Sequence, residues 1–271
     1  MLDVTEEEHV RSKERAIQHI PRLRANLAAL SELSIKVLKV PINIGRNNHL
    51  RFMLMSYTIK QIEHSRSLLR LKSSVDTTLV ARSMLEGLMQ LLWAMKQPRR
   101  RPLMWRVFAF ILDWRLLERQ WSQGVVVDSE TERHIRWGLR RYGKWFLTKE
   151  ARHAATARKP LPKDPYTKNW YGEREAAIFR DVGGQVLLEG AYSPFSEWHH
   201  WRPGAFGRLL SFDKQTSTFA MTTADPNQVA MALATGFQCL WQTMRLLNSR
   251  CRLRIGRDLI DLRRRQLALG K

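Results

Sequence analysis

Two pairs of polar side chains stand one helical turn apart in segments that are otherwise rich in apolar residues. Arg82 and Glu86 have the i, i+4 spacing of a helical ion pair, and Ser196 and His200 have the same spacing. Neutral histidine is the natural general base near pH 7, and an arginine beside it could bind a phosphate group. Cleavage of RNA by its own 2′-hydroxyl needs little more than these two groups. One candidate activity is therefore a metal-independent ribonuclease with His200 as base and Arg82 as phosphate-binding cation.

The same residues also fit a structural role. An Arg–Glu pair beside the apolar stripe of a central helix can lock helices together, and Ser–His pairs occur as helix caps and core hydrogen bonds. The chain has no Gly-x-Ser-x-Gly elbow, which argues against acyl transfer at Ser196. It also lacks the Arg-(four to six residues)-His motif of the helical ribonucleases of the HEPN class. Likeness to that class rests only on a helical bundle, positive charge and an Arg/His constellation.

A carboxylate-bound metal is a weaker alternative. The Glu-x-x-His half-motif of di-iron helical bundles occurs as Glu150/His153 and as Glu197/His200. A complete site would need two further carboxylates from facing helices, for which Glu86 and Asp113 are the candidates. Because this short motif arises readily by chance, we expect neither a metal nor another cofactor.

The elements that must position these residues are helices. Apolar residues recur every three or four positions, strand-like alternation is almost absent, and no hairpin turn signal separates apolar runs. The pattern predicts an all-α fold, a single helical bundle of about seven to nine helices. We expect helices over about 6–39, 49–72, 77–96, 103–122, from Ser129 through Phe146, 171–188 and 226–249, with a basic helix to the end. The predicted division is an N-terminal helix (1–45), a core domain (46–240) and a basic C-terminal extension (241–271).

Local signals refine these boundaries. Pro21 should kink the first helix or restart it, Asp76 should cap the third, and Ser129 should cap the fifth. Asp225, with Pro226 in the first turn, should mark the start of the helix expected over 226–249. Gly183 and Gly184 should break or bend the helix expected over 171–188. Three prolines and five basic side chains within 152–169 predict an exposed, mobile loop.

The charge of the chain is far from balanced. It contains 46 Lys and Arg against 25 Asp and Glu, a net charge of +21. Residues 99–170 carry +10 and residues 239–271 carry +7, whereas 171–238 carry −2. Such a surplus repels itself in a compact protein, so it indicates a polyanionic partner, RNA or DNA before an anionic membrane surface. The residues expected to contact phosphates are Arg99, Arg100, Arg101, Arg140, Arg141, Arg158, Lys159, Arg252, Arg254, Arg263, Arg264 and Arg265.

Cysteine usage and the N-terminus indicate the cytoplasm. Cys239 and Cys251 are too few and too far apart for a disulfide framework or a structural zinc site, and we expect them to be reduced. The polar, acidic start MLDVTEEEHV does not resemble a signal peptide. No apolar run approaches the ~20 residues of a membrane span.

Three landmarks in order resemble a family of bacterial helical proteins, domain of unknown function 5677. They are the Arg82-x-x-x-Glu86 helix, the aromatic segment RVFAFILDW, and Tyr192-x-x-x-Ser196-x-x-x-His200. The resemblance covers about residues 50–240 and implies an all-α fold without implying a reaction. It adds Tyr192 to the candidate site residues. A second histidine beside His200 and the Arg-rich C-terminal helix depart from the family pattern.

The sequence thus favours a nucleic-acid-associated protein, a ribonucleoprotein or defence component with His200, Arg82, Glu86, Ser196 and Tyr192 as its candidate site. It leaves open a protein partner or a homo-oligomer. The alternatives are a non-catalytic binding module, in which the Arg–Glu and Ser–His pairs are structural, and the carboxylate-metal enzyme.

Overall fold

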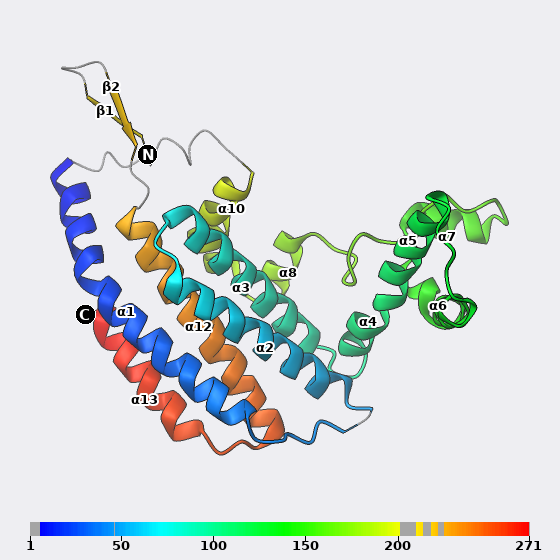
Figure 1. Ribbon diagram of the computed structural model, residues 1–271, viewed down its shortest axis with the longest axis horizontal. Helices are drawn as coiled ribbons and strands as arrows, with labels where there is room; N and C mark the ends of the chain where they lie inside the picture. The colour runs from blue at the N-terminus through cyan, green and yellow to red at the C-terminus, as the bar shows by residue number, and fades with distance from the viewer. Residues whose placement is uncertain (1–5, 46, 201–209, 214–217, 222–224, 271) are drawn as a thin grey trace. The chain divides into compact units, whose positions relative to one another are not determined.

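The computed structural model describes residues 6–45, 47–200, 210–213, 218–221 and 225–270. The fold is all-α, as predicted, and its helix count is close to the expected seven to nine (Figure 1). Within the described residues the only strands are β1 (Leu210–Asp213) and β2 (Thr218–Met221), an antiparallel hairpin that the sequence pattern did not predict. No described helix combines the length and the hydropathy that a membrane span requires.

The chain forms two compact units. The first contains residues 1–93 and 178–271, and the second contains residues 94–177. The second unit therefore lies inside the region 46–240 that we predicted as one core domain. The boundary predicted at 240/241 falls within a continuous helix, α12 (Pro226–Cys251).

The core of the first unit consists of α1 (Glu6–Leu38), α2 (His49–Arg70) and α12, which lie side by side (Figure 1). Pro21 lies inside α1 without ending the helix. The predicted apolar spacing of these helices becomes the buried stripe, which includes the fully buried Leu27, Leu30, Leu54 and Phe237. At the start of α12 the Asp225 carboxylate accepts from the Asn227 amide, and Pro226 occupies the first turn, as expected.

Small and hydroxyl-bearing residues bring these three helices close together. The buried hydroxyls of Ser34, Thr58 and Thr243 each donate to the carbonyl four residues back in their own helix. These three hydroxyls therefore add little volume to the core, and none of them is left there as an unpaired donor. Gly236 of α12 is the tightest point, because a Cβ there would lie 2.4 Å from Cδ1 of the buried Leu68 on α2.

Arg24 of α1 holds the C-terminal end of α2. Its guanidinium donates to the carbonyl oxygens of Leu69 (2.6 Å) and Leu71 (2.7 Å), and at longer range to Leu68 (3.3 Å). These carbonyls belong to the last turn of α2 and the residue after it. A cation at that position satisfies acceptors that the helix cannot pair and complements the helix dipole.

The last helix, α13 (Gly256–Leu267), packs against α1 and α12. The Trp241 indole donates to the Leu259 carbonyl (2.8 Å), and Asn26 of α1 donates to Gln266 (3.1 Å). The basic C-terminal segment is thus partly built into the first unit.

Helix α3 (Ser74–Met95) carries two of the candidate site residues and is held by α2. Gln61 donates to the Met84 carbonyl (2.7 Å), and Tyr57 donates to Gln90 (2.9 Å). The helix begins earlier than expected, and the Ser73 hydroxyl accepts from the Asp76 amide. The predicted Asp76 cap is therefore wrong: Asp76 lies within the first turn, where its charge still favours the helix dipole.

The single helix expected over 171–188 is divided. It consists of α8 (Glu175–Asp181) and α9 (Gln185–Leu187), which are followed by a π-helix η2 (Leu188–Tyr192) and by α10 (Ser193–His199). Gly183 makes the break with a φ of +72°, a backbone conformation that favours glycine.

The second unit contains α4 (Arg101–Val107), α5 (Ala109–Ser122), α6 (Ser129–Tyr142), the 3-10 helix η1 (Gly143–Phe146) and α7 (Lys149–Thr156). The helix predicted over 103–122 is interrupted at the buried Phe108, whose ring packs edge-on against Phe146 with centroids 5.1 Å apart. Asp128, not Ser129, caps α6 by accepting from the Thr131 amide.

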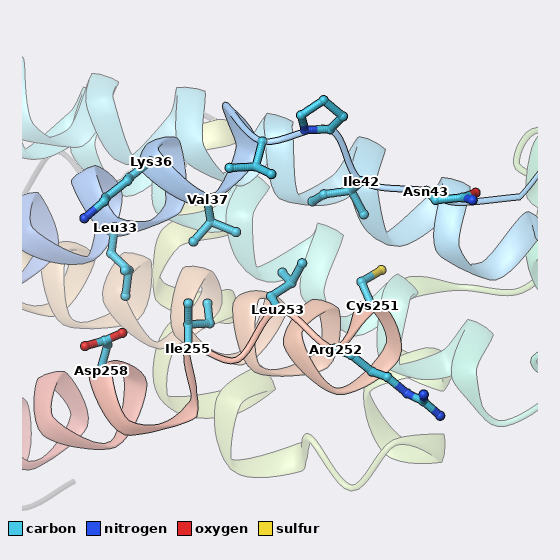
Figure 2. A pocket seen from close by; sticks show the side chains of 12 residues that line it. Leu33, Lys36, Val37, Ile42, Asn43, Cys251, Arg252, Leu253, Ile255 and Asp258 are labelled. Carbon is cyan, nitrogen blue, oxygen red and sulfur yellow. The ribbon is translucent and has the colours of Figure 1, made fainter.

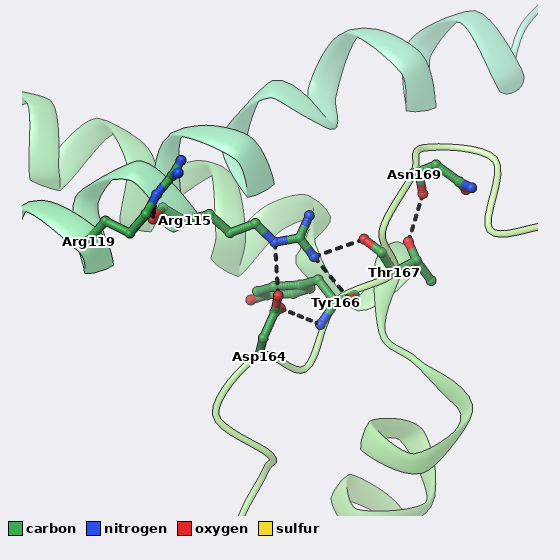
Figure 3. A network of polar contacts seen from close by, with 6 residues as sticks. All are labelled: Arg115, Arg119, Asp164, Tyr166, Thr167 and Asn169. Carbon is green, nitrogen blue, oxygen red and sulfur yellow. Dashed lines mark hydrogen bonds and ion pairs between the residues drawn. The ribbon is translucent and has the colours of Figure 1, made fainter. Parts of the chain in front are cut away.

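The segment expected as a mobile loop is tied down at both ends. Its first residues belong to α7, and its last residues are held by Arg115 of α5 (Figure 3). The Arg115 guanidinium pairs with Asp164 (2.9 Å) and donates to the carbonyls of Tyr166 (3.2 Å) and Thr167 (3.0 Å). Residues 157–164 between these anchors are exposed, as predicted.

The contact at Gly236 gives a stability prediction. Gly236→Ala should lower the free energy of unfolding by about 1–3 kcal/mol, because the added methyl group displaces the buried Leu68. Gly87→Ala in α3 is the matched control: its Cβ would meet Gln61 Nε2 at 3.4 Å, an ordinary contact. The control should be neutral or gain up to ~1 kcal/mol from helix propensity. Urea unfolding measures both, and equal effects of the two substitutions would contradict close packing at Gly236.

Candidate functional site

Three of the five candidate site residues meet in the first unit. Arg82 and Glu86 of α3 form an ion pair with 3.0 Å between Nη2 and Oε1. The Tyr192 hydroxyl of η2 donates to the same Glu86 oxygen (2.9 Å) and accepts from Arg82 Nη2 (3.1 Å). The Arg82 guanidinium also lies over the Tyr192 ring, 5.1 Å from its centroid. We refer to Arg82, Glu86 and Tyr192 as the triad.

Two local features bring Tyr192 to α3. Gly184 lies so close to that helix that a Cβ would be 3.0 Å from Met89 Sδ and 3.2 Å from the Phe179 carbonyl oxygen. The wider π-helical turn then follows, in which both the amide and the hydroxyl of Ser193 donate to the Leu188 carbonyl, five residues back. An added residue in a helical turn rotates the following side chains, and such turns are frequent at functional sites. Phe179 packs on the Tyr192 ring at 4.9 Å.

The triad is largely shielded from water. The side chains of Arg82 and Glu86 are 13% and 29% exposed. Burial raises the pKa of the Tyr192 phenol, and the Glu86 carboxylate raises it further, while Arg82 opposes the shift. Tyr192 is therefore a hydrogen-bond donor and not a base at neutral pH. Arg82 Nε is buried and has no hydrogen-bond partner among the described residues.

Ser196 and His200 do not form the expected side-chain pair. The Ser196 hydroxyl donates its single proton to the Tyr192 carbonyl (2.8 Å), and the His200 backbone amide donates to the Ser196 carbonyl (3.1 Å). The exposed His200 ring packs against the ring of His199, with centroids 4.9 Å apart. Within the described part of the chain, no contact joins the His200 side chain to the triad. The structure thus assembles Arg82, Glu86 and Tyr192, with Ser196 supporting the Tyr192 backbone.

The basic residues predicted to contact phosphates fall in both units. In the second unit all but the half-exposed Arg101 are exposed: Arg99, Arg100, Arg140, Arg141, Arg158 and Lys159. In the first unit, Arg252 and Arg254 are exposed and have positive φ values of 56° and 61°. Arg263 has a structural role, because it bonds to Gln238 (2.5 Å) and lies over Trp241. Arg264 pairs with Asp261, and Arg265 is exposed.

An aromatic group in the second unit was missed by the sequence analysis. The rings of Phe110, His134, Trp137 and Tyr142 form five edge-on or stacked pairs with centroids 5.3–6.2 Å apart. Trp137 is 46% exposed. The sequence does contain a signal, since Arg133, Arg136, Trp137, Arg140 and Arg141 recur at three- and four-residue spacing.

A pocket of about 510 Å³ lies in the first unit, between the end of α1 and the α12–α13 turn (Figure 2). Its walls are mostly apolar, and Lys36 and Asp258 stand at one end. The Cys251 thiol lines it, and burial raises the pKa of that thiol. Of the predicted site residues only Arg252 borders the pocket, and its side chain points away from the apolar walls in Figure 2.

The metal alternative gains no support from the geometry. Among the described residues, no three His, Cys, Asp or Glu side chains lie close enough to hold an ion. Glu150, one member of a Glu-x-x-His half-motif, lies in the first turn of α7. There, backbone and Thr148 hydrogen bonds lower the pKa of its carboxyl group.

The burial of the triad predicts an asymmetric response to substitution. Glu86→Ala should cost about 2 kcal/mol of unfolding free energy, since it leaves the 13%-exposed Arg82 cation without its counter-ion. The double variant Arg82→Met/Glu86→Leu should cost less than Glu86→Ala alone, because no buried charge remains. Tyr192→Phe, which keeps the ion pair, should cost about 1 kcal/mol. Urea denaturation of the wild type and the three variants measures these costs. A double variant that loses as much unfolding free energy as Glu86→Ala, or more, would contradict the cost of leaving the Arg82 charge without its counter-ion.

Comparison of the chain with models of protein families, with curated proteins and with solved structures finds no match. The resemblance of Arg82, Glu86, Tyr192, Ser196 and His200 to the family of unknown function 5677 therefore stays a prediction.

Proposed function

We propose that the protein binds the phosphate backbone of nucleic acid through its second unit, residues 94–177. The observation that carries this proposal is the exposure of that unit's basic side chains. Of its 19 Lys and Arg residues, 17 are exposed, and it contains only nine Asp and Glu. Even if every acid neutralised one base, a charge of +10 would remain on a unit of 84 residues.

The distribution of this charge favours nucleic acid over other polyanions. The exposed basic residues occur on α4, α5, α6, α7 and the turns between them, so they can follow an extended backbone and not a single small ligand. Two of the acids are engaged within the unit, Asp164 with Arg115 and Glu132 with Arg136. Exposed tryptophans lie beside arginines, an arrangement that suits a partner with both phosphates and planar bases.

The cellular setting is part of the same proposal. The protein would act in the cytoplasm of a bacterium, as a ribonucleoprotein or defence component. It would act there alone, as a homo-oligomer or with a protein partner. The hydrogen bonds within the triad support its role as a clamp between α3 and η2 in a non-catalytic binding module.

Retention on RNA should depend steeply on salt. The full-length protein should bind a labelled RNA in about 50 mM salt and lose most of its affinity by about 200 mM. Arg140→Gln/Arg158→Gln/Lys159→Gln should reduce the slope of log K against log salt by about 0.7 per lost phosphate contact. Arg22→Gln/Lys39→Gln, which removes two exposed charges from the first unit, is the control and should keep the wild-type slope. Absence of binding at low salt, or binding to anionic vesicles alone, would overturn the proposal.

A metal-independent ribonuclease is the second candidate, favoured by an exposed imidazole that follows the triad and by the unpaired Arg82 Nε. His200 would take the proton of a 2′-hydroxyl, whose oxygen bonds to the adjacent phosphorus to give a 2′,3′-cyclic phosphate. The P–O5′ bond breaks, the leaving 5′-oxygen takes a proton from water, and Arg82 would bind the phosphate. In EDTA, His200→Ala should then abolish RNA cleavage while RNA affinity and melting temperature stay unchanged. His199→Ala is the matched control. Cleavage that survives both substitutions, or no cleavage by the wild type, would contradict the ribonuclease proposal. The triad would then have only its structural role as a clamp between α3 and η2.

A further inference from the structure

Helix α6 presents one continuous basic face with a tryptophan in its middle. Arg133, Arg136, Trp137, Arg140 and Arg141 are all exposed. At 100° per residue they occupy an arc of roughly 140° of the helix, opposite the buried Ile135. The acids of the helix, Glu130 and Glu132, lie in its first turn, so the face becomes purely basic from residue 133 to residue 141.

Trp137 is held in place although nearly half of its surface is exposed. Its indole packs edge-on against Phe110 with centroids 6.0 Å apart. It is also stacked with the His134 ring at 6.1 Å and an interplanar angle of 15°. Rings packed in this way lose little freedom when a ligand binds, which favours Trp137 as a preformed platform.

A glycine in α6 makes this packing of Phe110 and Trp137 possible. Gly138 faces α5, where a Cβ would lie 2.3 Å from Cγ and Cδ1 of Phe110. Phe110 can therefore lie directly against the α6 backbone, where it supports Trp137 and stacks with Tyr142 at an interplanar angle of 14°. The exposed Trp137 ring is therefore supported by Phe110 and is not a freely moving surface side chain.

Arginines accompany the exposed rings. Arg141 lies 5.9 Å from the centroid of Trp137 and 5.6 Å from that of Tyr142, whose hydroxyl it also contacts (3.1 Å). Arg136 lies 5.4 Å from the Trp121 ring, which is 37% exposed. Cations are therefore placed beside ring faces, where phosphates and bases of one strand could be bound together.

We infer that this face of α6 binds single-stranded nucleic acid, with a base stacked on Trp137 and phosphates bound by Arg133, Arg140 and Arg141. The inference rests on the proposed function and specifies its ligand. A single strand is required because the bases of a duplex are stacked on one another and do not offer their faces to a side chain. Stacking also tolerates any base, so binding should show little sequence preference.

The test measures binding of the full-length protein to a fluorescein-labelled uridine 12-mer by anisotropy, with a deoxythymidine 12-mer and a duplex of equal length beside it. Trp137→Ala should weaken binding of both single strands roughly five- to hundredfold. The slope of log K against log salt should not change, since no charge is removed. Duplex binding should also be unaffected. Trp137→Phe should restore most of the affinity.

Arg140→Gln is the matched substitution one turn along the same face. It should lower the affinity for single strand and duplex alike and reduce the salt slope, the opposite signature to Trp137→Ala. Circular dichroism melting establishes that the variants are folded, and the Phe variant covers the case in which the Ala variant is not.

The outcomes separate the two proposals. If Trp137→Ala binds single strands as tightly as the wild type while Arg140→Gln binds them less tightly, backbone binding stands and the stacking platform is overturned. An equal loss on duplex and single strand also overturns it. If the wild type binds neither, the proposed function fails as well. A change in self-association without a change in RNA affinity would assign the face to protein contact.

Discussion

The close approach of α1, α2 and α12 is the constraint on which the first unit depends. Bulky side chains supply the burial, but the spacing is set by the residues that are small: serine and threonine hydroxyls that fold back onto their own carbonyls, and Gly236 facing Leu68. In an interior packed as densely as a crystal, one added methyl group has to displace a neighbour. Helix α3 is positioned by hydrogen bonds from Gln61 and Tyr57 of α2. The position of Arg82 and Glu86 in the triad therefore depends on this core.

The two units use arginine in different ways. In the first unit, three arginines have structural roles: Arg24 completes the C-terminal end of α2, Arg82 is paired and shielded, and Arg263 packs on Trp241. In the second unit Arg115 has a comparable role, because it binds Asp164 and the carbonyls of Tyr166 and Thr167. Most of the remaining basic side chains face solvent. The same residue type therefore has two roles, because a buried arginine must be compensated by nearby protein groups, whereas an exposed arginine stays available to a polyanion.

Several features of the fold could be predicted from local pattern. The stripes of α1, α2 and α12 follow from three- and four-residue apolar spacing, and Asp225–Pro226 marked the start of α12 correctly. The Arg82–Glu86 pair was predictable for the same reason, since residues four apart share a helix face. Other boundaries failed where tertiary contacts intervene: Phe108 interrupts a helix to pack on Phe146, and the segment after Gly183 passes through a π-helical turn to bring Tyr192 to α3. No periodicity in the sequence encodes either event.

The sequence by itself determined the all-α class, the surplus of positive charge and the ion pair of α3, because these depend on residues within a few turns of one another. Only the tertiary structure decided that Tyr192 completes the pair across 106 positions. It also decided that the Ser196 hydroxyl donates to the Tyr192 carbonyl and not to His200. In the same way, it decided that Phe110 packs against Gly138, where the ring supports Trp137. Each of these depends on which surfaces are buried against each other. That choice is made by the packing of the whole chain, since the surfaces that meet come from residues far apart in the sequence, which local spacing does not relate.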